Sequence, residues 1–188
     1  MGQNLSSNDS LTLLANTLAT VFALYFLITI FGDHSSHFNP VVSMVMLVRK
    51  EISTQVCTIF IILQISGAIL GVMLANYIFE LDPVHFSEKS RSGTHLFVSE
   101  ILATFGLLMV ILLSAKEKVA VTVAAYIGAA YWFTSSTSFA NPAGTIGRSF
   151  SNTFAGISTN DILHFCVAQI IGAFLALIVY RTFFESQK

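Results

Sequence analysis

Charged residues are scarce in this chain, and that scarcity excludes most classes of soluble protein. Asp, Glu, Lys and Arg together make up 10% of its 188 residues, whereas apolar residues make up 54%. A soluble domain carries about 25% charged residues, so this composition indicates a protein that lies in lipid. The net charge is −1 and the basic residues are scattered along the chain. This distribution offers no basic face for nucleic acid, so the expected partner is the lipid bilayer.

Cysteine is also scarce, and residues that hold metals or carry out catalysis do not cluster. Cys57 and Cys166 lie in separate apolar runs, so we interpret both as buried small hydrophobic residues rather than a disulfide or metal pair. His34 and His37 have no carboxylate or thiol cluster beside them, which argues against a metal site. Without a Ser-His, paired-acid or metal constellation, we expect neither an enzyme nor a bound cofactor.

The apolar residues form long runs separated by polar connectors. Each run approaches the ~20 residues that a helix needs to cross a ~30 Å hydrocarbon core. We therefore predict an all-α membrane protein with one domain over residues 1–188. Its predicted spanning helices are Leu11–Phe31, Ser53–Phe79, Leu96–Ala115, Val119–Phe139 and Ile162–Phe184.

Proline occurs only three times, and two of these prolines follow an asparagine within a strongly apolar stretch. The two tripeptides, which we call the boxes, are Asn39-Pro40-Val41 and Asn141-Pro142-Ala143. Proline has a fixed φ and no N–H, so it suits the first turn of a helix with a capping asparagine before it. We predict that a short helix begins at each box, inside the membrane. Paired interruptions at corresponding places are the best sequence pointer to a permeation or binding site.

The segment after each box repeats the same letters at the same spacing, which indicates two related repeats, 1–80 and 95–188. The repeated pairs are Gln64-Ile65, Gly67-Ala68 and Phe79-Glu80 in the first, and Gln169-Ile170, Gly172-Ala173 and Phe184-Glu185 in the second. Counting back from the boxes, Leu11–Phe31 corresponds to Val119–Phe139, and nothing corresponds to Leu96–Ala115. Three spans per repeat place the copies in opposite orientations. We therefore expect a six-span parent protein, in which Met1 is an internal methionine and a first helix precedes it.

Lysine and arginine indicate how the chain is oriented. If the spans alternate and the box segments dip in and return, Lys89 and Arg91 fall on one side of the membrane. The other side receives the larger basic group, which consists of Arg49, Lys50, Lys116, Lys118, Arg181 and Lys188. The positive-inside rule then places the C-terminus on the cytoplasmic side. We therefore expect a multi-pass protein of the cell membrane.

Both boxes resemble the signature boxes of the aquaporins and glycerol facilitators, the major intrinsic protein family. The resemblance rests on His37-Phe38-Asn39-Pro40-Val41, on Asn141-Pro142-Ala143 and on Ser99–Phe105, and it covers the chain except for the family's first helix. It implies an inverted repeat of spanning helices with two re-entrant half-helices, assembled as a homotetramer with one pore per subunit. It also implies that Glu100 supports the re-entrant loop backbone and that His37 bonds to nearby backbone.

Physical chemistry gives such boxes a function in permeation. Two half-helices that meet mid-membrane turn their positive N-terminal ends toward one another, which repels cations and orients water. The amides of Asn39 and Asn141 can donate to a passing oxygen. The segments that lead into them, 34–38 and 135–140, leave backbone carbonyls free as acceptors, which is tolerated only beside water or protein. This combination favours a passive channel for water and small neutral solutes.

Departures from the family pattern concern selectivity. The family has arginine directly after the second box, where this chain has Gly144, and Arg148 lies four residues further on. We predict that Arg148 still faces the pore mouth; the alternative is that it extends toward the membrane surface. Val41 replaces an alanine and adds a modest enlargement beside Asn39. The remaining filter positions are Ser138, Thr20 or Ala19, and Tyr131 or Trp132.

Small filter residues and a displaced arginine favour solutes larger than water, such as glycerol or undissociated arsenous acid. Two other functions stay open at this point. An ion-coupled transporter would share broken helices and inverted repeats, although Glu100 is the only acid within a predicted span. A five-span chain could also be a fragment that does not conduct, because an open groove exposes polar backbone to lipid.

Overall fold

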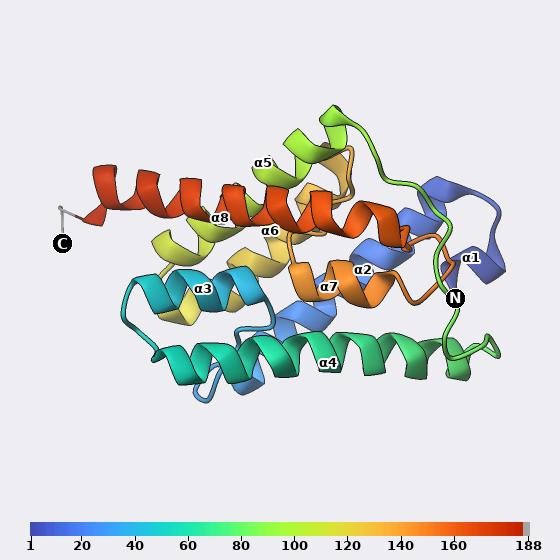
Figure 1. Cartoon of the computed structure of the whole chain (residues 1–188), viewed down its shortest axis with the longest axis horizontal. Helices are drawn as coiled ribbons and strands as arrows, with labels where there is room; N and C mark the ends of the chain where they lie inside the picture. Colours follow the sequence, from blue (N-terminus) through green and yellow to red (C-terminus); the bar gives the residue numbers. More distant parts are fainter. Residues whose placement is uncertain (186–188) are drawn as a thin grey trace.

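The computed structural model describes residues 1–185, and within them the chain is helical apart from its connectors (Figure 1). Lys188, which belongs to the predicted cytoplasmic basic group, lies outside the described residues. The helices are α1 (Gly2–Leu5), α2 (Asp9–Phe31), α3 (Pro40–Val48), α4 (Thr54–Ile78), α5 (Thr94–Leu113), α6 (Val119–Phe133), α7 (Pro142–Arg148) and α8 (Ile162–Phe183), with short 3₁₀ turns η1 (Lys116–Lys118) and η2 (Thr159–Asp161).

Four of the predicted spans are long and apolar enough to cross a membrane, judged by length and composition. They are α2, α4, α5 and the segment Thr159–Phe183, which consists of η2 followed directly by α8. The fifth, α6, has 15 residues and rises about 22 Å. The prediction of a helix over Val119–Phe139 was therefore too long. The chain leaves the helix at Thr134, and Thr137, Ser138 and Ala140 adopt φ of +60°, +47° and +46°.

Both half-helices begin at the proline of their box, as predicted. Helix α3 has 9 residues and α7 has 7, which corresponds to about 13 Å and 10 Å. Figure 1 shows them one after the other between α8 and α4, and both contact these long helices. Their N-terminal ends face each other at the centre of the bundle.

Close helix packing in the second repeat depends on Gly172. A Cβ atom built on this residue of α8 would lie 2.4 Å from the carbonyl oxygen of Ile101 on α5, so only glycine permits this approach. The corresponding Gly67 of α4, and Gly71 one turn later, have no atom within 4 Å of the same position. Helix α4 thus presents a small-residue face outward, among exposed apolar side chains that include Leu63 and Leu70.

The core lies where α3, α5, α6 and α8 meet. Val45, Leu108, Ile127 and Leu177 are buried there, together with Val41 of the first box. Residues behind the boxes are therefore fixed by ordinary apolar packing. This packing determines where the two asparagines lie.

Candidate permeation site

Each box asparagine caps the half-helix that it precedes. The Oδ1 atom of Asn39 accepts from the N–H of Val41 at 3.2 Å. The Oδ1 atom of Asn141 accepts from Ala143 and Gly144, at 3.0 and 3.2 Å. These bonds satisfy the free N–H groups of a first helical turn. The N–H groups of Val41, Ala143 and Gly144 are therefore paired within their own helix ends.

The two asparagines also bond reciprocally across the repeats. The Nδ2 atom of Asn39 donates to the carbonyl of Ala140 at 2.7 Å, and Nδ2 of Asn141 donates to the carbonyl of Phe38 at 2.9 Å. Each amide thus binds the residue just before the opposite box. A side-chain amide carries two N–H donors, so one N–H of each asparagine forms no hydrogen bond with the residues that the structure describes.

Each half-helix is held in place by one glutamine of a neighbouring long helix, α3 by a glutamine of α4 and α7 by a glutamine of α8. Gln169 donates to Thr145 of α7 at 2.9 Å and to Glu100 at 2.7 Å. Gln64 donates to Ser43 of α3 at 3.0 Å and also to the carbonyl of His37. The repeated Gln-Ile pairs identified these residues as equivalent. Their contacts with the half-helices were not evident from the sequence.

Glu100 lies behind the segment that leads into the second box. Its carboxylate is fully buried. It accepts from the backbone N–H of Phe139 at 2.9 Å and of Ala140 at 2.8 Å. In the first loop, the N–H of Phe38 instead donates to the carbonyl of Ser36 within the loop, at 2.9 Å. The two loops therefore hold their backbones by different means.

The expected bond from the His37 ring to nearby backbone is not found. Its Nδ1 atom is buried without a hydrogen-bond partner among residues 1–185. The ring packs edge-on against Phe60 instead, with 5.8 Å between centroids. It is the His37 backbone carbonyl, not the imidazole, that is bonded, by Gln64.

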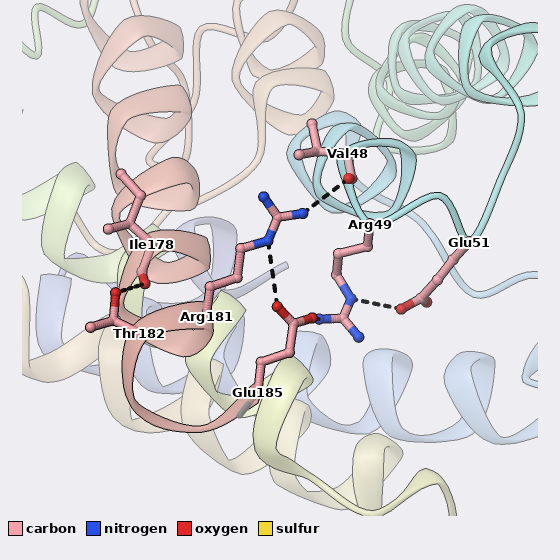
Figure 2. A network of polar contacts seen from close by, with 7 residues as sticks. All are labelled: Val48, Arg49, Glu51, Ile178, Arg181, Thr182 and Glu185. Carbon is pink, nitrogen blue, oxygen red and sulfur yellow. Dashed lines mark hydrogen bonds and ion pairs between the residues drawn. The ribbon is translucent and has the colours of Figure 1, made fainter. Parts of the chain in front are cut away.

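The far ends of the half-helices are tied to long helices of the opposite repeat. Asn76 of α4 donates to the carbonyl of Phe150, just after α7, at 2.9 Å. Arg181 of α8 donates to the carbonyl of Val48, the last residue of α3, at 3.1 Å. Figure 2 shows the second tie, in which Glu185 bridges Arg181 and Arg49 at 3.6 and 3.2 Å. Both ends of each half-helix are thus fixed.

A cavity of about 310 Å³ runs beside both asparagines. Its polar side consists of the two asparagines and the loop residues before them, from Ser36 to Phe38 and from Ser138 to Ala140. Its other side is largely apolar, formed by Leu24, Ile28, Val42, Met46, Leu107, Ile111, Val119, Val123 and Ile127. No Asp or Glu is among its lining residues in the described part of the chain.

One end of the cavity, which we call the mouth, is formed by Thr20, Tyr131 and Arg148. Arg148 Nη2 donates to the Tyr131 hydroxyl at 3.0 Å, and that hydroxyl lies 3.2 Å from Thr20 Oγ1. Arg148 therefore lines the cavity. Of the two alternative pairs, Thr20 and Tyr131 line the cavity, whereas Trp132 and Ala19 are exposed and do not.

Two further predicted filter residues line the same cavity. The Oγ atom of Ser138 is buried without a partner among the described residues, and Ser138 contributes to the wall. Gly144 also lines the wall, and a Cβ atom there would meet only Asn141, at 3.6 Å or more. Space thus remains where a longer side chain would project.

The other box residues lie behind the wall. Pro40, Val41, Pro142 and Ala143 are buried and do not line the cavity. Val41 is 1% exposed and packs in the core, so the larger side chain that stands beside Asn39 in place of alanine lies behind the cavity wall.

Comparison with known proteins agrees with this geometry. Residues 1–180 match the family described as Major intrinsic protein. Aquaglyceroporin AqpS of Rhizobium meliloti (strain 1021) is 44% identical over 185 residues, which cover 96% of this chain and 79% of that protein. The chain, with its paired boxes and all-helical membrane fold, belongs to the major intrinsic protein family.

Proposed function

We propose that this protein is a passive channel for water and small neutral solutes of the glycerol class. The observation that carries the proposal is the pair of reciprocally bonded asparagines, each with one N–H left over, on the wall of a single cavity. A solute oxygen that passes the boxes can accept from both. Neutral polar molecules therefore replace the hydrogen bonds that they leave behind in water.

The two sides of the cavity suit a polyol. Carbonyl and amide groups on the loop side can bond to hydroxyls, whereas Leu24, Ile127 and their apolar neighbours face the carbon side of the molecule. The unpartnered hydroxyl of Ser138 adds a bonding group near the mouth. Such division into polar and apolar walls is the usual basis of small-molecule specificity.

The mouth favours solutes wider than water. Gly144 leaves space on the wall, and Thr20 and Ser138 are small. Glycerol and undissociated arsenous acid are both small, uncharged and rich in hydroxyls, so the same groups serve either. The relative from Rhizobium meliloti is named an aquaglyceroporin, which supports the same solute class.

The cavity wall argues against ion coupling. Glu100, the acid within a span, accepts three N–H bonds from the loop and Gln169, and it does not line the cavity. Arg148 adds a positive charge at the mouth, which repels cations. A transporter would need a titratable or ion-binding group exposed to the path.

We further propose that the protein lies in the cell membrane as a homotetramer with its C-terminus in the cytoplasm. The outward apolar faces of α2 and α4 support contact with lipid or with other subunits. The basic residues Arg49 and Arg181 lie together near the C-terminal ends of α3 and α8. This grouping supports a cytoplasmic face there.

Stopped-flow light scattering on liposomes with the purified chain tests the function. We expect glycerol uptake well above that of empty liposomes, and a return toward the empty rate in Gly144→Trp, whose indole fills the open wall. If the chain takes up water but no glycerol, the wide-mouth proposal is wrong. If it takes up neither, the channel function is wrong.

A further inference from the structure

A buried arginine in the α4–α5 connector has no role in the function proposed above. Arg91 is 8% exposed, although it lies in a connector between spanning helices. Its only sequence-based significance was as one of the two basic residues on the sparsely basic side. A charged side chain that is nearly fully buried requires compensating bonds, so its partners indicate what it does.

The Arg91 guanidinium joins the two segments on either side of α7. It donates through Nη1 to the carbonyl of Ser136 at 3.3 Å, in the segment that leads into the second box. It also donates to Gly156 at 2.8 Å and Phe154 at 3.2 Å, in the segment that follows α7. One planar side chain thus spans the entrance and exit of the half-helix that carries Arg148.

Arg91 is itself held firmly in place. Its backbone N–H donates to Asp161 Oδ2 at 2.7 Å, next to the start of α8. Burial, together with the nearby charge of Arg148, lowers the pKa of Arg91 to about 10. The group therefore stays protonated at neutral pH, and its charge is fixed close to the mouth.

Arg91 and Arg148 share one aromatic ring. The guanidinium carbon of Arg148 lies 4.2 Å from the centroid of Phe139, and that of Arg91 lies 4.8 Å from it. The ring is restrained by packing, because Phe139 is 7% exposed and its ring lies edge-on against Phe165 with 5.2 Å between centroids. A cation over an aromatic face is attracted to it, and like charges repel one another. Arg91 therefore affects the position of Arg148 in two ways: it repels the Arg148 guanidinium, and it binds the same Phe139 ring.

We propose that Arg91 is a positioning residue for Arg148 and thereby sets the width of the mouth. By fixing the segments around α7 and sharing Phe139, it holds the Arg148 guanidinium against the Tyr131 hydroxyl. Without the Arg91 guanidinium, the repulsion on Arg148 is lost. Arg148 then moves toward the position that Arg91 occupied, and the mouth widens. The inference rests on the proposed channel function and adds a residue outside the cavity wall to its specificity.

The test compares the uptake of erythritol, a longer polyol, with that of glycerol. We expect Arg91→Met to raise the erythritol-to-glycerol permeability ratio about threefold or more, the size of one cation–π contact. Lys89→Met is the matched control. Lys89 lies on the same connector and donates to the same Phe154 carbonyl at 2.8 Å, but it lies over Phe154 rather than Phe139. Its ratio stays at the wild-type value.

A double-mutant cycle separates positioning from simple loss of structure. If Arg91 acts through Arg148, then adding Arg91→Met to Arg148→Met leaves the ratio where Arg148→Met alone placed it. Additive changes overturn the proposal, and so does a wild-type ratio in Arg91→Met.

If Arg91→Met does not fold, Arg91→Lys is tested in its place, because one ammonium group cannot reach the segments on both sides of α7. A wild-type ratio there overturns the proposal too. If wild-type liposomes take up no glycerol, the polyol specificity proposed above is wrong and this inference with it; if they take up no water either, the channel function is wrong as well.

Discussion

Replacing Glu100 with glutamine tests the support of the second re-entrant loop. The carboxylate accepts three bonds, from Phe139 N at 2.9 Å, Ala140 N at 2.8 Å and Gln169 Nε2 at 2.7 Å. Glutamine keeps one acceptor oxygen and turns an NH₂ group toward at least one of these donors. A buried donor left unsatisfied costs about 1–3 kcal/mol, and a lost charge-assisted bond is of similar size. We therefore expect Glu100→Gln to lower the free energy of unfolding by about 2–5 kcal/mol.

Thermal unfolding in detergent, followed by circular dichroism, measures this effect beside glycerol uptake in liposomes. Both the unfolding temperature and the uptake rate fall in Glu100→Gln, because Ala140 also supplies the carbonyl that Asn39 bonds. Glu117→Gln is the matched control, since Glu117 is exposed in η1 and forms no ion pair among residues 1–185. An unfolding temperature in Glu100→Gln equal to that of the control would refute the reasoning.

Three further substitutions test separate parts of the structure. Gly144→Arg projects a guanidinium into the open wall, so glycerol uptake falls more than water uptake in stopped-flow assays; equal losses would contradict the assigned wall position. Gly172→Ala forces a Cβ against the Ile101 carbonyl and destabilises by about 1–3 kcal/mol, whereas Gly67→Ala, in open space, leaves thermal stability unchanged or slightly higher. Arg181→Gln removes one exposed ion pair, with Glu185 (Figure 2), and lowers the free energy of unfolding by less than about 1 kcal/mol; a larger loss, measured by thermal unfolding, would show that the bond from Arg181 to the Val48 carbonyl of α3 contributes more than this.

Local sequence signals predicted the elements around the boxes well. Asparagine followed by proline specifies a capped helix start through its own backbone chemistry, so α3 and α7 begin where expected. Spacing along one helix likewise placed Arg148 on the cavity side. Composition predicted the long spans, but it could not locate the end of α6. There the backbone turns at Thr137 and Ser138 through positive φ values that apolar content does not report.

Long-range contacts were beyond the reach of sequence reasoning. Asn76 and Arg181 tie the ends of half-helices that belong to the opposite repeat, and no local pattern pairs residues so far apart. Arg91 looked like a loop cation, since nothing beside it in the sequence indicates that three carbonyls surround it. The bond expected from the His37 ring is also a matter of long-range contacts. Gln64, which lies far along the chain, donates to the backbone carbonyl of His37 and not to its imidazole.

The central claim is that the second amide N–H of each box asparagine donates a hydrogen bond to neutral solutes as they pass through the cavity. Glycerol uptake by Asn141→Asp tests it most directly. Aspartate retains the oxygen that caps Ala143 and Gly144 but loses both amide donors. We predict a drop of about tenfold in glycerol permeability, the equivalent of one hydrogen bond, and a lower unfolding temperature, because the bond from Asn141 to the Phe38 carbonyl is also lost. Uptake at the wild-type rate would contradict the account.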